Sequence, residues 1–243
     1  MHAFFLADAH LRNPDDHNYL LMLSFLEGLP ASVDMLVIVG DFFEFWIGDS
    51  AEAFPHYRPV LDAVERLTQK GVKLLFFEGN HDFHLGRYFK KTFNADVYPD
   101  KADITLDGKR LFICHGDIIN RADYGYRALR LAFRNPFTRL LAKILPPSVP
   151  AFVADRLGRR SKGNHKAAEA KWDYRRLVKD FAIARFEEGF DVVVTAHYHR
   201  PMLENIHGKS ILALGDWITQ FSYSEWIDGK LEQKSYQQEQ AEV

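Results

Sequence analysis

Short apolar runs recur along the chain and are separated by polar and turn-forming residues. The runs are four to six residues long and rich in Val, Ile, Leu and Phe. That composition is typical of strands buried on both faces of a sheet. We therefore predict strands over residues 4–7, 35–39, 73–77, 110–114, 191–196 and 210–214.

Helical periodicity occupies several of the intervals between these runs. Residues 19–29 and 59–70 repeat apolar positions every three or four residues, and Gly71 follows the second stretch as a candidate C-cap. Residues 172–187 form a third candidate helix that ends before Gly189. Strands that alternate with helices predict an α/β fold with a mainly parallel or mixed central sheet, a layered β-sheet core flanked by helices.

Five clusters of metal-ligand residues directly follow the apolar runs. They are Asp8-Ala9-His10, Gly40-Asp41, Gly79-Asn80-His81-Asp82, His115-Gly116-Asp117 and His197-Tyr198-His199. In open α/β sheets, side chains on the loops that leave the strands converge at the carboxyl edge. Asp and His bind Mn, Zn or Fe, and a shared carboxylate can hold two ions roughly 4 Å apart. The clusters therefore predict a two-metal hydrolase acting on a phosphate ester.

Residues 121–166 differ from the rest of the chain. They contain eleven Lys or Arg and two acidic residues, an excess of nine positive charges. Because the whole chain has a net charge of −2, the rest of the chain has a net charge of −11. Basic and apolar residues alternate there up to Pro146-Pro147, and a second amphipathic piece follows at residues 151–157. We interpret the segment as a helical lid inserted over the site; the alternative is a helical hairpin that packs on the sheet with a solvated basic face.

Length and composition set the remaining limits. A chain of 243 residues with 47% hydrophobic content can build one core, so we expect a single domain with the lid as an insert. The one cysteine, Cys114, excludes an internal disulfide and suits a reducing compartment. The N-terminus lacks a signal-peptide pattern, and no apolar stretch is long enough to span a bilayer, so we expect a soluble or peripheral cytoplasmic protein. The polar tail, residues 233–243, is expected to be frayed.

The ordered clusters resemble the calcineurin-like metallophosphoesterase superfamily. The resemblance implies that Asp8, His10 and His199 hold one metal and that Asn80, His115 and His197 hold the other. It implies that Asp41 bridges both and that His81 stabilises charge or protonates the leaving oxygen, while Asp82 orients its loop. The implied cofactors are two divalent ions, Mn²⁺ first, with Zn²⁺ or Fe²⁺ as alternatives. They would activate water for in-line attack on phosphorus.

A narrower resemblance concerns the substrate. Residues 40–49, Gly-Asp-Phe-Phe-Glu-Phe-Trp-Ile-Gly-Asp, are similar to a signature of UDP-2,3-diacylglucosamine hydrolases of the lipid A pathway. The run Asn80-His81-Asp82-Phe83 and the basic insert that ends in Ser161-Lys162 also fit. The resemblance implies hydrolysis of the pyrophosphate to UMP and 2,3-diacylglucosamine 1-phosphate. One departure is His81, which matches the wider superfamily where many of these hydrolases carry Arg.

The same resemblance implies the substrate contacts and partners. The expected contacts are Asn80, His81, Asp123, Tyr126, Ser161, Lys162, Lys166 and His197. The basic lid would meet a glycolipid nucleotide and the anionic inner-membrane surface, and the protein is expected to be a monomer. A charge of −11 outside the lid argues against nucleic acid as a partner. Two alternatives stay open, namely a related phosphoesterase with another phosphodiester or nucleotide-linked substrate and a non-catalytic scaffold of the same fold.

Overall fold

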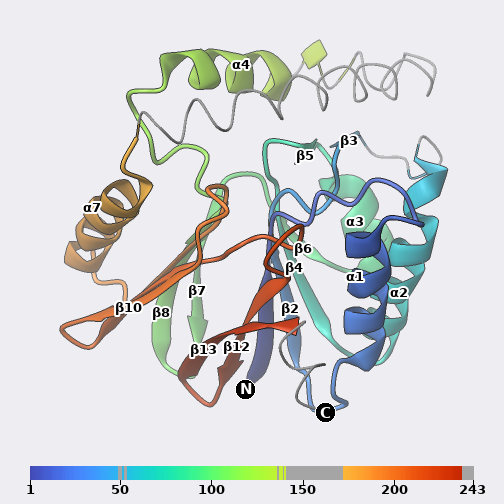
Figure 1. Cartoon of the computed structure of the whole chain (residues 1–243), viewed down its shortest axis with the longest axis horizontal. Coiled ribbons are helices and arrows are strands. Elements are labelled where there is room, and N and C mark those ends of the chain that lie inside the picture. The colour runs from blue at the N-terminus through green and yellow to red at the C-terminus, as the bar shows by residue number, and fades with distance from the viewer. Residues whose placement is uncertain (49–50, 52–53, 136, 139, 141–171, 237–243) are drawn as a thin grey trace.

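The helices and strands form four layers, seen edge-on in Figure 1. The computed structural model describes residues 1–48, 51, 54–135, 137–138, 140 and 172–236. Three helices lie on one side, two β-sheets lie face to face in the middle, and one helix covers the other side. The expected layered α/β architecture is confirmed, although the central layer consists of two mixed sheets instead of one.

The first sheet has six strands in the order β13-β12-β1-β2-β4-β6. Neighbours among β1, β2, β4 and β6 pair in parallel, whereas β12 and β13 extend the sheet in the antiparallel sense. Its strands are β1 (His2–Leu6), β2 (Met35–Val39), β4 (Lys73–Phe77), β6 (Asp96–Tyr98), β12 (Ser222–Ile227) and β13 (Lys230–Ser235).

The second sheet has five strands in the order β10-β11-β9-β8-β7. The inner strands β11, β9 and β8 are parallel, and β10 and β7 pair with them antiparallel at the two edges. The strands are β7 (Lys101–Leu106), β8 (Lys109–Cys114), β9 (Val192–Thr195), β10 (Met202–Ile206) and β11 (Lys209–Ala213). A short parallel pair, β3 (Trp46–Ile47) and β5 (Asp82–Phe83), joins two of the loops described below.

The period of two along the strands divides the core between the layers. In β1, Phe4 and Leu6 pack toward the helices, while Ala3 and Phe5 pack toward the second sheet. The helices on the first side are α1 (His17–Gly28), α2 (Arg58–Gln69), which a short 3₁₀ turn (Pro55–Tyr57) precedes, and α3 (Gly86–Phe93). On the other side α7 (Tyr174–Glu187) covers the outer face of the second sheet through residues such as Val178.

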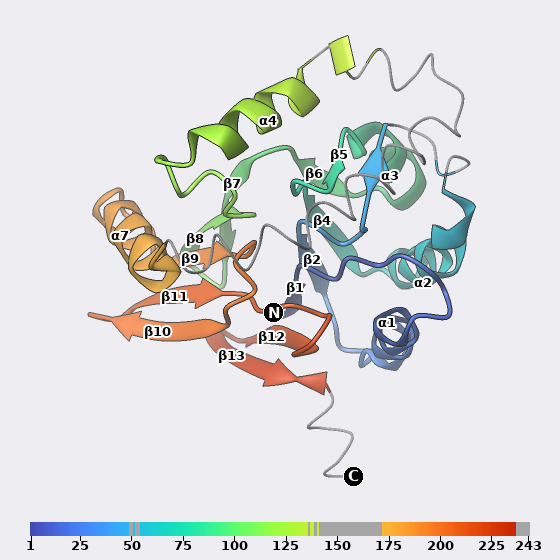
Figure 2. The same ribbon diagram turned by 45° about the horizontal axis from the view of Figure 1, so that its top comes forward.

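Helix α4 (Tyr124–Arg134) begins the predicted lid and lies across one end of the two sheets (Figure 1; Figure 2). Asp123 caps it, because its Oδ1 accepts a 3.0 Å hydrogen bond from the N–H of Tyr126. Most of the predicted insert after this helix, including residues 151–157, lies outside the described residues.

All six predicted strands and all three predicted helices are present. Two strands, β2 and β4, have the expected ends, and the others shift by one or two residues. The prediction of a frayed tail is wrong for Gln233–Ser235, which belong to β13 and pair with β12. Here the polar sequence hides an edge strand, whose outer side needs no apolar residues.

Candidate metal centre

Every predicted ligand cluster follows the carboxyl end of a parallel strand. Asp8 and His10 follow β1, Asp41 follows β2, Asn80 and His81 follow β4, His115 follows β8, and His197 and His199 follow β9. The loops are tied directly to one another, since the N–H of Asp8 donates to the carbonyl of Gly40 and that of His10 to the carbonyl of Asp41. The clusters therefore lie together at the carboxyl ends of the parallel strands of both sheets.

Two glycines make this convergence sterically feasible. A Cβ at Gly79 would lie 2.1 Å from Oδ1 of Asp41, and a Cβ at Gly40 would lie 2.5 Å from Nδ1 of His115. Gly40 also has φ of +83°. The glycines that precede Asp41 and Asn80 are thus required by the close approach of the loops.

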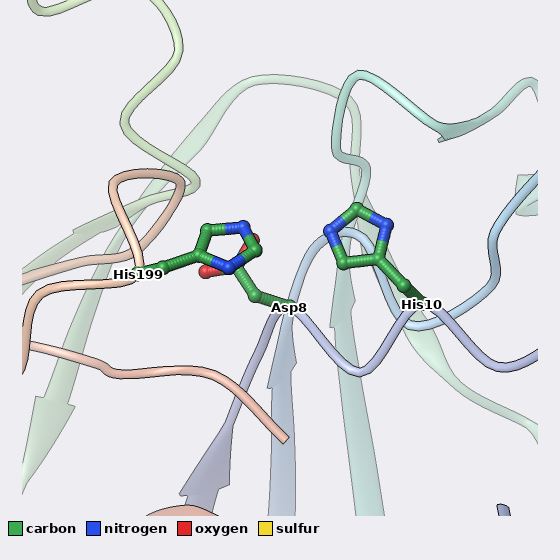
Figure 3. Close-up of side chains that lie close together, drawn as sticks. All are labelled: Asp8, His10 and His199. Carbon is green, nitrogen blue, oxygen red and sulfur yellow. The ribbon is translucent and has the colours of Figure 1, made fainter. Parts of the chain in front are cut away.

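The first group of side chains comprises Asp8, His10 and His199, whose ligand atoms lie within 4.8 Å of one another (Figure 3). His199 Nε2 is 3.7 Å from Asp8 Oδ1, and the imidazoles of His10 and His199 stack with centroids 5.3 Å apart. The backbone N–H of His197 donates to the other oxygen of Asp8 at 2.9 Å. The structure thus brings together three residues that are up to 191 positions apart in sequence.

The second group comprises Asp41, His115 and His197. His115 Nε2 lies 3.2 Å from Oδ1 of Asn80, which adds an amide oxygen to this side. The rings of His115 and His197 approach edge to face with centroids 5.1 Å apart. Asn80, His115 and His197 are therefore adjacent, as the resemblance implies.

Asp41, a member of the second group, also faces the first. Its Oδ2 is 3.8 Å from Nε2 of His10 in the first group and 3.4 Å from Nε2 of His115 in the second. Its Oδ1 accepts a 2.8 Å hydrogen bond from the N–H of His81. One carboxylate oxygen thus faces both groups, which is the placement that a bridging ligand needs.

Five of these side chains sit on a left-handed backbone. Asp8, His10, Asp41, His197 and His199 have φ between 45° and 74°. Such values are uncommon outside glycine and cost free energy that the surrounding structure must supply. Their concentration in one constellation marks a functional site.

Burial and mutual charge shift the pKa values of the group. Burial disfavours ionised Asp41, but the charges of His115 and His81 hold the pKa of its carboxyl well below the ordinary value. Burial likewise opposes the charge on His115, and the Asp41 carboxylate outweighs it and raises the pKa of that imidazole to about 10. Burial and repulsion from His115 lower the pKa of His197 to about 3, so its ring is neutral at pH 7.

The donor set fits divalent metal ions. Within the described part of the chain, Oδ1 of Asp8 and Nε2 of His10 are buried without a hydrogen-bond partner. A buried carboxylate oxygen and imidazole nitrogen in that state are costly unless a cation or a proton joins them. Imidazole and carboxylate donors suit Mn, Fe and Zn.

Comparisons with known proteins give the family. The model of the calcineurin-like phosphoesterase family matches residues 1–201. The chain belongs to this family. UDP-2,3-diacylglucosamine hydrolases of Aeromonas salmonicida and Shigella dysenteriae are each 32% identical to it, over 91% of this chain and 88% and 93% of theirs. The corresponding protein of Haemophilus influenzae is 29% identical over 89% of this chain and 90% of its own.

The phosphoesterase fold is also that of a solved archaeal phosphodiesterase. That structure is 13% identical, covers 96% of this chain and 99% of its own, and has a TM-score of 0.50. Family membership and the donor set agree that the protein is a metal-dependent phosphoester hydrolase.

His81 lies at the edge of the phosphoesterase metal centre. Its ring meets that of His10 edge to face at 4.7 Å, and its Nδ1 is 2.8 Å from the carbonyl oxygen of Glu44. Because a carbonyl only accepts, Nδ1 carries the proton and donates, which leaves Nε2 as the nitrogen available to a substrate.

The five predicted lid contacts have three different outcomes. Tyr126 belongs to the site, because its hydroxyl donates to Oδ2 of Asp117 at 2.7 Å and its ring lies 5.6 Å from that of His197. Asp123 is the N-cap of α4. Ser161, Lys162 and Lys166 lie outside the described residues.

Three carboxylates near the ligands received no individual role from the sequence. Asp117 belongs to the cluster His115-Gly116-Asp117, and Glu44 lies in the run of residues 40–49. Asp216 was overlooked, although Leu214-Gly215-Asp216 after a strand repeats the pattern of Val39-Gly40-Asp41. A Gly-Asp pair at the end of an apolar run is the signal that would have found it.

Proposed function

We propose that this phosphoesterase hydrolyses the pyrophosphate bond of UDP-2,3-diacylglucosamine to UMP and 2,3-diacylglucosamine 1-phosphate, a step of lipid A biosynthesis. The observation that carries the hydrolytic part is the position of Asp41 Oδ2 between His10 and His115. The substrate part is supported by the relatives' names and by their coverage of most of both chains.

In this proposal Asp8, His10 and His199 hold one ion, and Asn80, His115 and His197 hold the other. Asp41 bridges them. Two bound cations would supply positive charge to the phosphoryl oxygens and activate water near neutral pH. Mn²⁺ is proposed from the resemblance to UDP-2,3-diacylglucosamine hydrolases, and the imidazole and carboxylate donors are also compatible with Zn²⁺ and Fe²⁺ as alternatives.

The protein's own side chains position the substrate and handle its charge. Nδ1–H of His81 donates to the Glu44 carbonyl, so Nε2 is the nitrogen that would meet a phosphoryl or leaving oxygen. Asn80 and His197, which both lie next to His115, would contact the same phosphoryl group. The hydrogen bond from the Tyr126 hydroxyl to Asp117 holds the Tyr126 ring beside that of His197.

The lid is proposed to extend over residues 121–166 and to bind the acylated end of the substrate. Asp123, Tyr126, Ser161, Lys162 and Lys166 are its proposed polar contacts. Support comes from α4, whose outer side exposes Tyr124 and Leu131, with Phe137 and Leu140 also exposed just beyond it. Apolar side chains among basic ones suit contact with a glycolipid and an anionic membrane surface.

Association with the inner membrane would then be peripheral. Among the described residues, no helix has both the length and the apolar character needed to cross a bilayer. Sedimentation with vesicles containing anionic lipid tests this part, and a monomer is the oligomeric state that we expect by gel filtration.

The decisive assay compares three substrates in the presence of Mn²⁺: UDP-2,3-diacylglucosamine, a UDP-sugar without acyl chains, and bis-p-nitrophenyl phosphate. Preferred hydrolysis of the acylated compound is expected. In ¹⁸O-labelled water the label should appear in UMP, which identifies attack at the uridine-linked phosphorus. Turnover of only the unacylated compounds would contradict the lipid substrate and leave the metal centre in place.

A second candidate is a phosphoesterase with another nucleotide-linked or phosphodiester substrate. The observation that favours it is His81, where many UDP-2,3-diacylglucosamine hydrolases carry Arg. The variant His81→Arg separates the two, because it should preserve or raise activity on the diacyl substrate if that is the physiological one.

A further inference from the structure

The histidines of the two proposed metal positions differ in the group that lies next to their Nδ1 atoms. Nδ1 of His10 is 3.6 Å from Oε2 of Glu44, and Nδ1 of His199 is 3.6 Å from Oδ2 of Asp216. In both cases Nε2 faces the opposite way, toward Asp41 and Asp8 respectively. Both histidines of the proposed metal position formed by Asp8, His10 and His199 therefore have a carboxylate next to Nδ1, the nitrogen that points away from the other ligands.

At the other position the ring nitrogen of His115 that points away from Asp41 meets a neutral group. The carboxylate of Asp117 is also close enough to interact with His115 and His197, but its charge is already paired with Arg130 and its Oδ2 accepts from the Tyr126 hydroxyl. Nδ1 of His115 lies 2.8 Å from the backbone carbonyl of Val39, to which it donates. Asn80, the neighbouring ligand, offers a neutral amide oxygen. A carbonyl fixes the tautomer as well as a carboxylate does, but it adds no negative charge.

Asp216 is built rigidly into the loop after β11. Its Oδ1 accepts from the N–H groups of Ile218 at 2.8 Å and of Thr219 at 2.6 Å, and only 4% of the residue is exposed. The same loop holds the backbone of the ligands, because Gln220 Nε2 donates to the carbonyl of His199 and the N–H of Trp217 donates to the carbonyl of Asp8.

The backbone of Glu44 is anchored by loops of the first sheet. Its N–H donates to the carbonyl of Leu11 at 2.9 Å, next to His10, and its own carbonyl accepts from His81. Two loops from different sheets therefore place one carboxylate each behind a histidine of the same metal position.

We propose that Glu44 and Asp216 are positioning residues that orient His10 and His199, and that they make the Asp8–His10–His199 position the tighter of two unequal metal sites. The inference rests on the two-metal function proposed above. A carboxylate behind a ligating imidazole fixes its tautomer and orientation and raises its basicity. The two added negative charges also favour a dication at this position over the other.

The test is metal binding, without turnover. Metal-free protein is titrated with Mn²⁺, and free Mn²⁺ is followed by electron paramagnetic resonance alongside calorimetry. Two unequal binding classes are expected. His10→Asn should abolish the tight class and His115→Asn the loose one, which assigns each class to its position.

Glu44→Gln and Asp216→Asn should each weaken the tight class by about 10- to 100-fold and leave the loose class unchanged. Glu225→Gln is the matched control, since it removes a buried carboxylate that pairs with Lys234 in the first sheet. Asp216→Asn could loosen its loop, so Glu44→Gln provides an independent variant, and circular dichroism checks the fold of both.

Two equal sites in the wild type, or an effect of both variants on the loose class alone, would overturn the proposal. So would unchanged binding in both variants. These outcomes are independent of the substrate, because failure to hydrolyse UDP-2,3-diacylglucosamine would leave the two binding classes as they are.

Discussion

Asp82 accepts hydrogen bonds from the backbone that carries Asp41. Its Oδ1 lies 3.0 Å from the N–H of Asp41 and 2.8 Å from that of Gly79, while Oδ2 lies 2.7 Å from the N–H of Phe42. One buried carboxylate thereby joins the loops after β2 and β4, which carry the proposed ligands Asp41 and Asn80. Asp82 is thus bonded to the loop backbone, and it belongs to neither of the two metal-ligand groups described above.

Replacing Asp82 with Ala should destabilise the protein as well as its site. Several buried N–H groups would lose their acceptor, so the free energy of unfolding should fall by about 3 kcal/mol. Urea denaturation measures the change. Asp62→Ala, which removes an exposed carboxylate paired with Arg58 on α2, should cost less than about 1 kcal/mol; equal losses in the two variants would contradict the structural role of Asp82.

Asp41→Asn should nearly abolish hydrolysis. The substitution keeps the shape and one oxygen but removes the charge that faces both groups. Loss of several kcal/mol of transition-state stabilisation corresponds to a decrease of about 10³-fold in kcat. The measurement is kcat on bis-p-nitrophenyl phosphate with metal content determined in parallel, and activity near the wild-type level would refute the bridging role.

Gly79→Ala should inactivate the enzyme while the fold survives. The new Cβ would lie 2.1 Å from Oδ1 of Asp41, so the carboxylate or the loop must move. The matched control is Gly28→Ala, where nothing lies within 4 Å of the added methyl. We expect activity to fall at least about tenfold in the first variant, since small displacements of a catalytic group are costly, and to stay at the wild-type level in the control.

Arg134 joins helix α4 to the metal-binding loop. Its Nη2 donates to the carbonyls of Glu78 at 3.1 Å and Gly79 at 2.7 Å, while its Nη1 donates to the carbonyl of Pro99 and to Oδ1 of Asp100. Arg134→Lys cannot reproduce this fork of donors, so kcat/KM should fall by about tenfold. Arg127→Lys, on the same helix and bonded to the Arg121 carbonyl, is the control and should change kcat/KM by less than about twofold.

Cys114 should be inert in the native protein. Burial raises the pKa of its thiol to about 12, so the folded state retains the proton at pH values where the unfolded chain loses it. This group therefore contributes a loss of stability as pH rises from the ordinary thiol pKa toward 12. A thiol reagent at pH 8 should modify Cys114 slowly in buffer and rapidly in urea. Rapid native labelling, or loss of activity in Cys114→Ala, would contradict this assignment.

The buried parallel strands could be predicted from sequence because their signal is local. Five apolar residues followed by a ligand, as in β2 and Asp41, report both the strand and its end. The edge strands β10 (Met202–Ile206) and β13 (Lys230–Ser235) could not be predicted in this way, because polar residues that face solvent interrupt their apolar positions. The division into two sheets is also absent from the local pattern, because it depends on which strands pair with one another.

The sequence predicts which residues form the candidate metal centre, but not the contacts that hold those residues in place. Asp216 and His199 are separated by seventeen positions and by two strands, and only the fold of the second sheet places them 3.6 Å apart. The same holds for Tyr126 and Asp117, whose bond depends on where α4 crosses the sheets. The roles of Ser161, Lys162 and Lys166 stay predictions.

The left-handed backbone at Asp8, His10, Asp41, His197 and His199 restricts how this metal centre can be altered. Asn, Asp and His tolerate such φ values better than other residues with a side chain. A ligand exchange to Cys or Glu, made to change the preferred metal, would add backbone strain of about 1–3 kcal/mol at each position. The backbone conformation therefore limits which residues can serve as ligands at these positions. A change of metal preference is easier to obtain by substituting Glu44 or Asp216, next to the ligating histidines, than by substituting the ligands themselves.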